Sequence, residues 1–404
     1  MTISKTNDLQ TYKIIILLSY VCIASLSSAM ITPALDGIKL AFNLSTGSLE
    51  WIITIFLLGY VFGQLIYAPL SNRYGRITTL RAGLCINLAG IILCLISAYS
   101  SSYWLLLIGR LVTALGAAAG LSITYTLIHE LLPEEKAKHV LSFVIIAFTA
   151  GIAISVFIGG IVTEYLHWYD CFWILLVHGI IMLALTGLFS ETLTQKIKLD
   201  FSAISHSYLH ALKSTQLIIF SLGLGLVSAF SYGYSAAAPL YAEEVLHLTP
   251  SQYGLWNIVN MIGMLLSGFS GFYLVKRIGA AKTLIVNFIA LIPFLIILVA
   301  ISLLPHVSPV IFFVDTTILF LLFGAIMGPS SHFALKIKAN KAGATSMMSF
   351  INVFSASISV AVMGYLPMIS IQQFSCILIV FYVITALLIT GYMTKNHHYI
   401  HALN

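Results

Sequence analysis

The stretch Leu-Ser-Asn-Arg-Tyr-Gly-Arg at residues 70–76 ends a long apolar segment and has a counterpart in the second half of the chain, where residues 274–279 read Leu-Val-Lys-Arg-Ile-Gly. In both copies an arginine follows the leucine by three residues and a glycine follows it by five. Thr79-Leu80 is repeated at the same offset as Thr283-Leu284. The chain of 404 residues therefore consists of two halves built on one plan.

The composition indicates an integral membrane protein. Hydrophobic residues make up 60% of the chain and charged residues only 8%, whereas a soluble domain is about one quarter charged. A helix needs about 20 apolar residues to cross a bilayer. Twelve segments are long enough, so we predict an all-α fold with spans near 14–35, 50–69, 79–99, 103–128, 139–162, 171–189, 215–240, 253–275, 282–304, 309–331, 342–366 and 372–394.

The most polar connection divides these spans six and six. We expect an N-terminal six-helix bundle over residues 1–190, a cytoplasmic linker over 191–214 and a C-terminal six-helix bundle over 215–404. Duplicated apolar halves with a basic turn at the same place in each are typical of secondary transporters.

The basic residues predict the orientation. If both termini are cytoplasmic, every lysine and arginine falls on the cytoplasmic side except Lys39, which lies outside, and Arg110, which lies within a span. No loop combines a basic run with aromatic residues, which argues against a nucleic-acid partner. We expect a multi-pass protein of a bacterial cytoplasmic (inner) membrane, surrounded by lipid.

Several motifs together resemble one transporter family. They are Phe-Leu-Leu-Gly-Tyr at 56–60, the run from Gly63 to Arg76, Thr-Pro-Ala-Leu at 32–35, the segment 110–118, and Gly-Ala-Thr-Ser at 343–346. The chain resembles the major facilitator superfamily, in particular the Bcr/CflA branch of twelve-helix drug:proton antiporters. The resemblance implies two pseudo-symmetric six-helix bundles around a central cavity.

The resemblance also implies that the loop after the second span helps to gate the transporter. Glycine permits a tight turn there, and the arginines lie at the cytoplasmic boundary. The alternative is that these arginines only fix the topology. The predicted gating residues are Gly63, Asn72, Arg73, Gly75, Arg76, Arg277 and Gly279.

Five positions depart from the family pattern. Asn72 stands where the family has an aspartate, so the loop loses a negative charge. Ala29 replaces the acid of the first span, and an alanine cannot carry a proton. Val156 replaces a proline that would bend the fifth span, and Thr113-Ala114 replaces Gln-Gly. These changes leave the fold assignment intact but weaken the case for standard drug:proton antiport.

Two charged residues lie well inside predicted spans. Arg110 falls in span four and Asp315 in span ten, at nearly equivalent places in the two halves. Because charge is costly at bilayer depth, such residues tend to mark function. We predict that they form a substrate or coupling site, either as a pair or separately. The alternatives are hydration of Asp315 near the outer surface and hydrogen bonding of Arg110 within its own bundle.

Aromatic groups could contribute to the same site. Tyr20, Tyr125, Tyr232 and Tyr234 lie on spans one, four and seven, and aromatic residues with a few polar groups suit an amphipathic organic substrate. Each could equally hold helices together.

The sequence does not suggest an enzyme. It has no phosphate-binding glycine-lysine loop and no metal-ligand spacing, so we expect neither cofactor nor metal. We predict a monomeric transporter that moves a small organic molecule by alternating access, most simply by proton-coupled efflux of drugs or metabolites. The alternative is a specific carrier for an anionic metabolite or siderophore-like chelator, in either direction.

Overall fold

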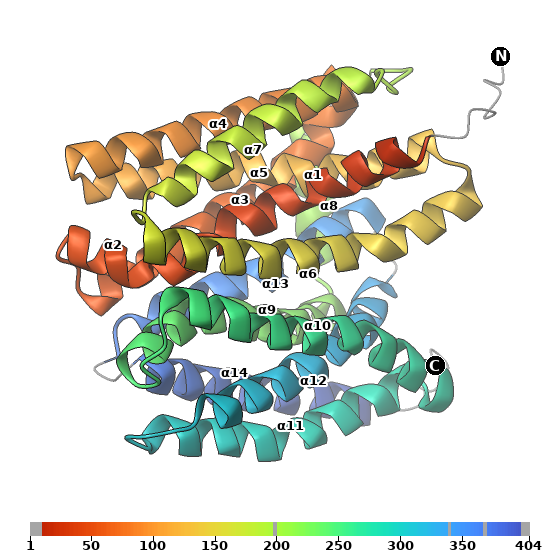
Figure 1. Cartoon of the computed structure of the whole chain (residues 1–404). Helices are drawn as coiled ribbons and strands as arrows, with labels where there is room; N and C mark the ends of the chain where they lie inside the picture. The colour runs from red at the N-terminus through yellow and green to blue at the C-terminus, as the bar shows by residue number, and fades with distance from the viewer. Residues whose placement is uncertain (1–9, 197–199, 338–340, 367–369, 397–404) are drawn as a thin grey trace. The chain divides into compact units, whose positions relative to one another are not determined.

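The computed structural model describes residues 10–196, 200–337, 341–366 and 370–396, and over these residues it is entirely helical (Figure 1). Helices of the first half are α1 (Thr11–Ala29), η1 (Thr32–Ala34), α2 (Leu35–Ala41), α3 (Thr46–Tyr74), α4 (Arg76–Ser100), α5 (Tyr103–Leu131), α6 (Glu134–Tyr165), α7 (Asp170–Leu185) and η2 (Thr186–Leu188). Those of the second half are α8 (Phe201–Leu212), α9 (Thr215–Glu244), α10 (Pro250–Ile278), α11 (Ala280–Leu303), α12 (Pro309–Leu335), α13 (Lys341–Met363) and α14 (Ser370–Lys395).

Twelve helical segments of the described chain are long and apolar enough to cross a membrane. The first of them joins α1, η1 and α2 into one span, Thr11–Ala41. The predicted all-α fold with twelve spans is confirmed. Helix α6 runs unbroken over 32 residues and contains no proline, as the replacement at Val156 led us to expect.

The chain divides into two compact units. The first contains residues 1–37 and 55–199, and the second contains residues 38–54 and 200–404. Helix α3 is thus shared, because its first turns belong to the second unit and the rest to the first. The domain bounds predicted at 190 and 215, and the cavity between the bundles, stay predictions.

Small residues hold helices of the first unit close together. Helices α4 and α5 lie side by side (Figure 1), and a methyl group on Gly109 would lie 2.7 Å from the Cys94 sulfur. The amide of Asn87 donates to the Thr113 carbonyl at 2.9 Å across the same contact. Within apolar lipid there is no hydrophobic driving force between helices. Close backbone approach of this kind stabilises the helix pair through van der Waals contact instead.

The second unit is held by aromatic packing around α9. The Phe230 ring lies 4.7 Å from the Phe320 ring and 4.6 Å from the Phe323 ring, both on α12.

Part of the predicted linker belongs to this unit as helix α8. The Asp200 side chain caps this helix by accepting from the Ala203 amide at 2.9 Å.

Candidate functional site

The duplicated turn has the same backbone geometry in both halves. Gly75 separates α3 from α4 with φ 112°, and Gly279 separates α10 from α11 with φ 85°. They are the only glycines with positive φ in the described chain. A side chain is strained in this conformation, which explains why glycine recurs at the same offset.

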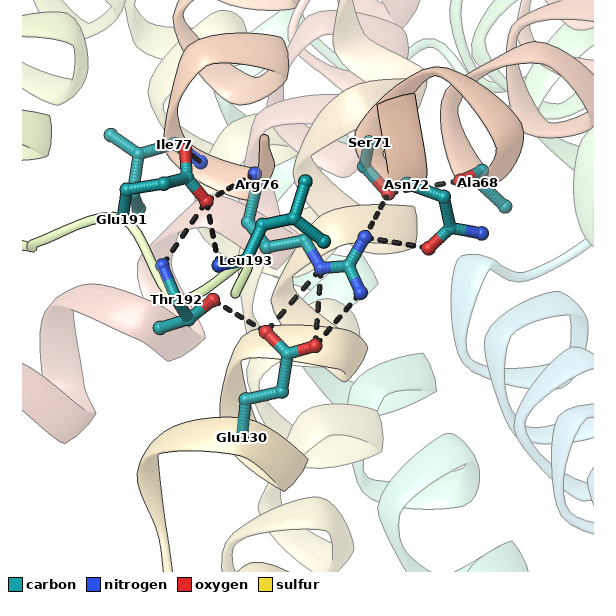
Figure 2. A network of polar contacts seen from close by, with 9 residues as sticks. All are labelled: Ala68, Ser71, Asn72, Arg76, Ile77, Glu130, Glu191, Thr192 and Leu193. Carbon is teal, nitrogen blue, oxygen red and sulfur yellow. Dashed lines mark hydrogen bonds and ion pairs between the residues drawn. The ribbon is translucent and has the colours of Figure 1, made fainter. Parts of the chain in front are cut away.

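A carboxylate distant in sequence caps the helix that follows the first turn. Gly75 has no side chain to cap α4. Instead, Glu191 accepts from the backbone amides of Arg76 at 2.6 Å and Ile77 at 3.1 Å (Figure 2). Helix N-termini have unpaired N–H groups and a positive partial charge, so an anion stabilises them. Partial burial raises the pKa of Glu191, but bonds from backbone amides outweigh it, and the net pKa lies below its ordinary value.

The side chain of Arg76 connects three elements (Figure 2). Its Nη2 donates to Glu130 of α5 at 2.8 Å and its Nε donates to the same carboxylate at 3.1 Å. Its Nη1 donates to the Asn72 amide oxygen at 2.6 Å. Thr192 also donates to Glu130. We call Asn72, Arg76, Glu130, Glu191 and Thr192 the Arg76 network.

The Arg76 network shows how the chain accommodates Asn72. Glu130 supplies the negative charge that position 72 lacks, and Asn72 supplies a neutral acceptor. Sequence reasoning missed Glu130 and Glu191, because each lies far along the chain from residue 76 and only the packing of α5 and the segment after η2 brings them there.

The other predicted gating residues differ in their surroundings. Arg73 makes no hydrogen bond or ion pair within the described residues. Arg277 is exposed and donates only to Tyr273, one turn before it, at 3.3 Å. The described contacts of Arg277 thus contain no counterpart of the Arg76 network. Gly63 is not in the loop: it lies inside α3, where a methyl group would be 2.6 Å from the Ala118 side chain and 2.8 Å from the Leu115 oxygen of α5.

Arg110 is buried inside the first unit, with 1% of its surface exposed. Its Nη1 donates to the Ser27 carbonyl of α1 at 2.6 Å, and its guanidinium carbon lies 4.2 Å from the centre of the Phe56 ring. The Nε group has no partner. No carboxylate pairs with Arg110 within the described part of this unit. Its positive charge is thus held by a carbonyl and an aromatic face.

Asp315 is buried inside the second unit, with 4% of its surface exposed. Neither carboxylate oxygen has a hydrogen-bond partner. It lies one helical turn after Phe312, which packs against Tyr234 and Tyr241 of α9. The hydrated position considered for Asp315 does not fit this burial. Its pairing with Arg110 stays a prediction, since the two residues belong to different units.

The predicted tyrosines fall into two groups. Tyr20 is buried and donates to the Met182 carbonyl at 3.0 Å, and Tyr234 donates to Asn257 at 3.1 Å and accepts from Asn260 at 2.7 Å. Both hydroxyls are thus engaged in hydrogen bonds within their own unit, and contact of either tyrosine with a substrate stays a prediction. Tyr232 is half-buried and Tyr125 exposed, so these two remain candidates.

Glu50 is a second buried carboxylate that sequence reasoning misplaced. Predicted span two begins at residue 50, but α3 begins at Thr46, so Glu50 lies about one turn inside the helix. Only 3% of Glu50 is exposed, and neither carboxylate oxygen has a partner. A hydropathy pattern could not reveal this, because the first turn of α3 is polar in sequence.

Comparison with known proteins identifies the family. Residues 17–364 match the sequence profile of the Major Facilitator Superfamily. The chain belongs to this superfamily. It is 22% identical over 263 residues to a bicyclomycin resistance protein homolog of Haemophilus influenzae, covering 63% of this chain and 64% of that protein. It is 25% identical over 273 residues to an uncharacterized transporter of Rickettsia bellii, again covering 64% of the relative.

Solved structures support the same fold. The chain superimposes on the inward-open xylose transporter XylE from E. coli with a TM-score of 0.73 and 15% identity, covering 93% of this chain and 95% of that one. A bacterial homolog of the human lysosomal transporter Spinster gives a TM-score of 0.69 and 16% identity, covering 94% and 96%. The protein is a multi-pass membrane protein of this superfamily.

Proposed function

We propose that this transporter exports small organic molecules across a bacterial cytoplasmic membrane by alternating access, in exchange for protons. The observation that carries the proposal is Asp315, a membrane-embedded carboxylate with both oxygens unpaired. An ionised carboxylate is costly in such surroundings, so binding and release of a proton changes its energy strongly. That property is what a coupling group needs, and Ala29 cannot provide it.

The Bcr-like resemblance supports efflux. The matched relative of H. influenzae is named as a bicyclomycin resistance homolog, and the loop motif points to the same branch. Tyr125 and Tyr232 are the aromatic candidates for contact with an amphipathic substrate. We further propose that both termini are cytoplasmic and that the protein works as a monomer.

A second candidate is a carrier for an organic anion. Arg110 favours it, because this buried cation has no carboxylate partner within the described part of its unit and retains an unpaired Nε group. A carboxylate or hydroxamate of a metabolite or chelator would satisfy that donor.

One experiment separates the two candidates. The protein is reconstituted in liposomes with an imposed pH gradient and an internal pH dye, and bicyclomycin, ethidium or a tricarboxylate is added. Antiport predicts drug-induced proton movement that Asp315→Asn reduces to background, because asparagine cannot release a proton. Asp200→Asn is the matched control, since asparagine also caps a helix.

The outcomes are distinct. Drug-induced proton movement that persists in Asp315→Asn would exclude Asp315 as the coupling group. If neither drug moves protons but the tricarboxylate does, and Arg110→Gln abolishes that movement, the anion carrier is correct and drug efflux is wrong.

A further inference from the structure

Glu50 is a buried carboxylate that the proposed function does not use. Residues 38–54 belong to the second unit, and only 3% of Glu50 is exposed. Both oxygens lack a partner, and Thr54, one turn further on the same face of α3, is also buried with an unpaired hydroxyl. The start of α3 therefore carries a dry, polar face.

Two glycines bring this face against the turn that follows α13. A methyl group on Gly47 would lie 2.5 Å from the Gly364 oxygen. One on Gly364 would lie 2.7 Å from the Gly47 Cα and 3.2 Å from the Glu50 Cβ. Beside them, Trp51 Nε1 donates to the Tyr365 hydroxyl at 3.2 Å. We call the packing of Gly47 and Glu50 on Gly364 the Gly364 contact.

No lysine, arginine or histidine forms an ion pair with Glu50 among the residues that the structure describes. Lys39 is the only lysine or arginine in residues 38–54, and its ammonium is paired with Glu244 at 3.1 Å. Residues 342–363 of α13 contain no ionisable side chain, and the hydroxyl of Tyr365 beyond them accepts a hydrogen bond from Trp51. The end of α9 adds only the acids Glu243 and Glu244. Ionisation of Glu50 within the contact would thus be opposed by dehydration.

We propose that Glu50 is a proton-binding site that controls the opening of the Gly364 contact. While the contact is closed, the carboxyl holds its proton. When the first turns of α3 separate from Gly364, water reaches the carboxyl, its O–H bond breaks and the proton passes to water. This inference rests on the proposed proton-coupled transport and gives the chain a second titrating group besides Asp315.

Opening of the Gly364 contact should depend on pH. The closed contact binds the proton more tightly than the open one, so low pH favours the closed contact and rising pH favours the open one. One linked proton changes this equilibrium by at most about tenfold per pH unit. Glu50→Gln keeps the shape and the neutral charge of the protonated side chain and should hold the contact closed at every pH.

The test measures labelling of Thr54→Cys by a water-soluble maleimide in purified protein between pH 5.5 and 8.5. Cysteine fits the buried threonine site, and unmodified protein gives the background from native thiols. Dividing the rate by that of Thr54→Cys/Glu50→Gln at each pH cancels the ionisation of the thiol itself. We expect this ratio to be near one at low pH and to rise by up to about tenfold per pH unit. Thr54→Cys/Glu135→Gln, which removes an exposed acid, should label like Thr54→Cys.

A second ratio needs no Glu50 variant. Ser45 is exposed just before α3, so Ser45→Cys reports thiol chemistry alone, and the Thr54→Cys to Ser45→Cys ratio should also rise with pH. A ratio that stays constant over the pH range in either comparison overturns the proposal. If Glu50 controls labelling but no pH gradient drives transport, the proposed function fails and the Glu50 site stands. The reverse result removes Glu50 alone.

Discussion

At the scale of single residues, the Arg76 network forms without an acid at position 72. Arg76 donates to Glu130, Asn72 and Ser71 at once, and Glu191 receives the backbone amides that Gly75 leaves uncapped. Because folding lowers the pKa of Glu191, the stability from this cap is complete above its ordinary pKa. That stability is lost as the pH falls through the lowered value.

Arg76 cannot be replaced by lysine without loss. A single ammonium can reach Glu130 or Asn72 but cannot form the fork that serves both. We expect Arg76→Lys to lower stability by about 1–2 kcal/mol, because the pair is partly exposed and the lost bonds involve a charged donor. Thermal denaturation in detergent measures this. Arg73→Lys, at a position without hydrogen bonds in the described chain, is the control, and an equal loss in both variants would contradict the role of the Arg76 network.

At the scale of elements, the two copies of the turn have the same backbone conformation, but their side chains make different contacts. Gly75 and Gly279 adopt the same unusual conformation. The helix after the first copy receives the carboxylate of Glu191 at its N-terminus, and Gly279 gives α11 no side-chain cap of its own. The repeat thus preserves the bend between two helices.

The cap that Glu191 gives to α4 predicts that alanine lowers stability more at position 75 than at position 279. Backbone strain should cost about 1–3 kcal/mol in both Gly75→Ala and Gly279→Ala. Gly75→Ala should cost about 1 kcal/mol more, because its methyl group would collide with Glu191 and disturb the cap of α4. Gly268→Ala is the control, since nothing lies near that helical position. Equal melting temperatures for the first two variants would show that the Glu191 cap contributes nothing.

At the scale of the whole molecule, local patterns predicted the spans and distant contacts remained hidden. Span length and the glycine turn depend on residues close together in sequence, so both could be predicted. The faces of Tyr20 and Tyr234 depend on helix rotation, which an almost uniformly apolar span does not reveal. Glu191 and Glu50 contact residues that lie more than 100 positions away in the sequence. No local sequence pattern therefore marks them. The site is therefore less predictable than the fold.

The orientation of the molecule is the remaining whole-chain prediction. Basic residues cluster at one end of the helices, including Arg73, Arg76, Lys276 and Arg277, and such clusters face the cytoplasm. A green fluorescent protein fused after the last residue should fluoresce, because it folds in the cytoplasm, and alkaline phosphatase at the same site should be inactive. Alkaline phosphatase fused after His306, in the connection between α11 and α12, should be active. The opposite pattern would invert the topology, place the Arg76 network outside and turn the Gly364 contact toward the cytoplasm.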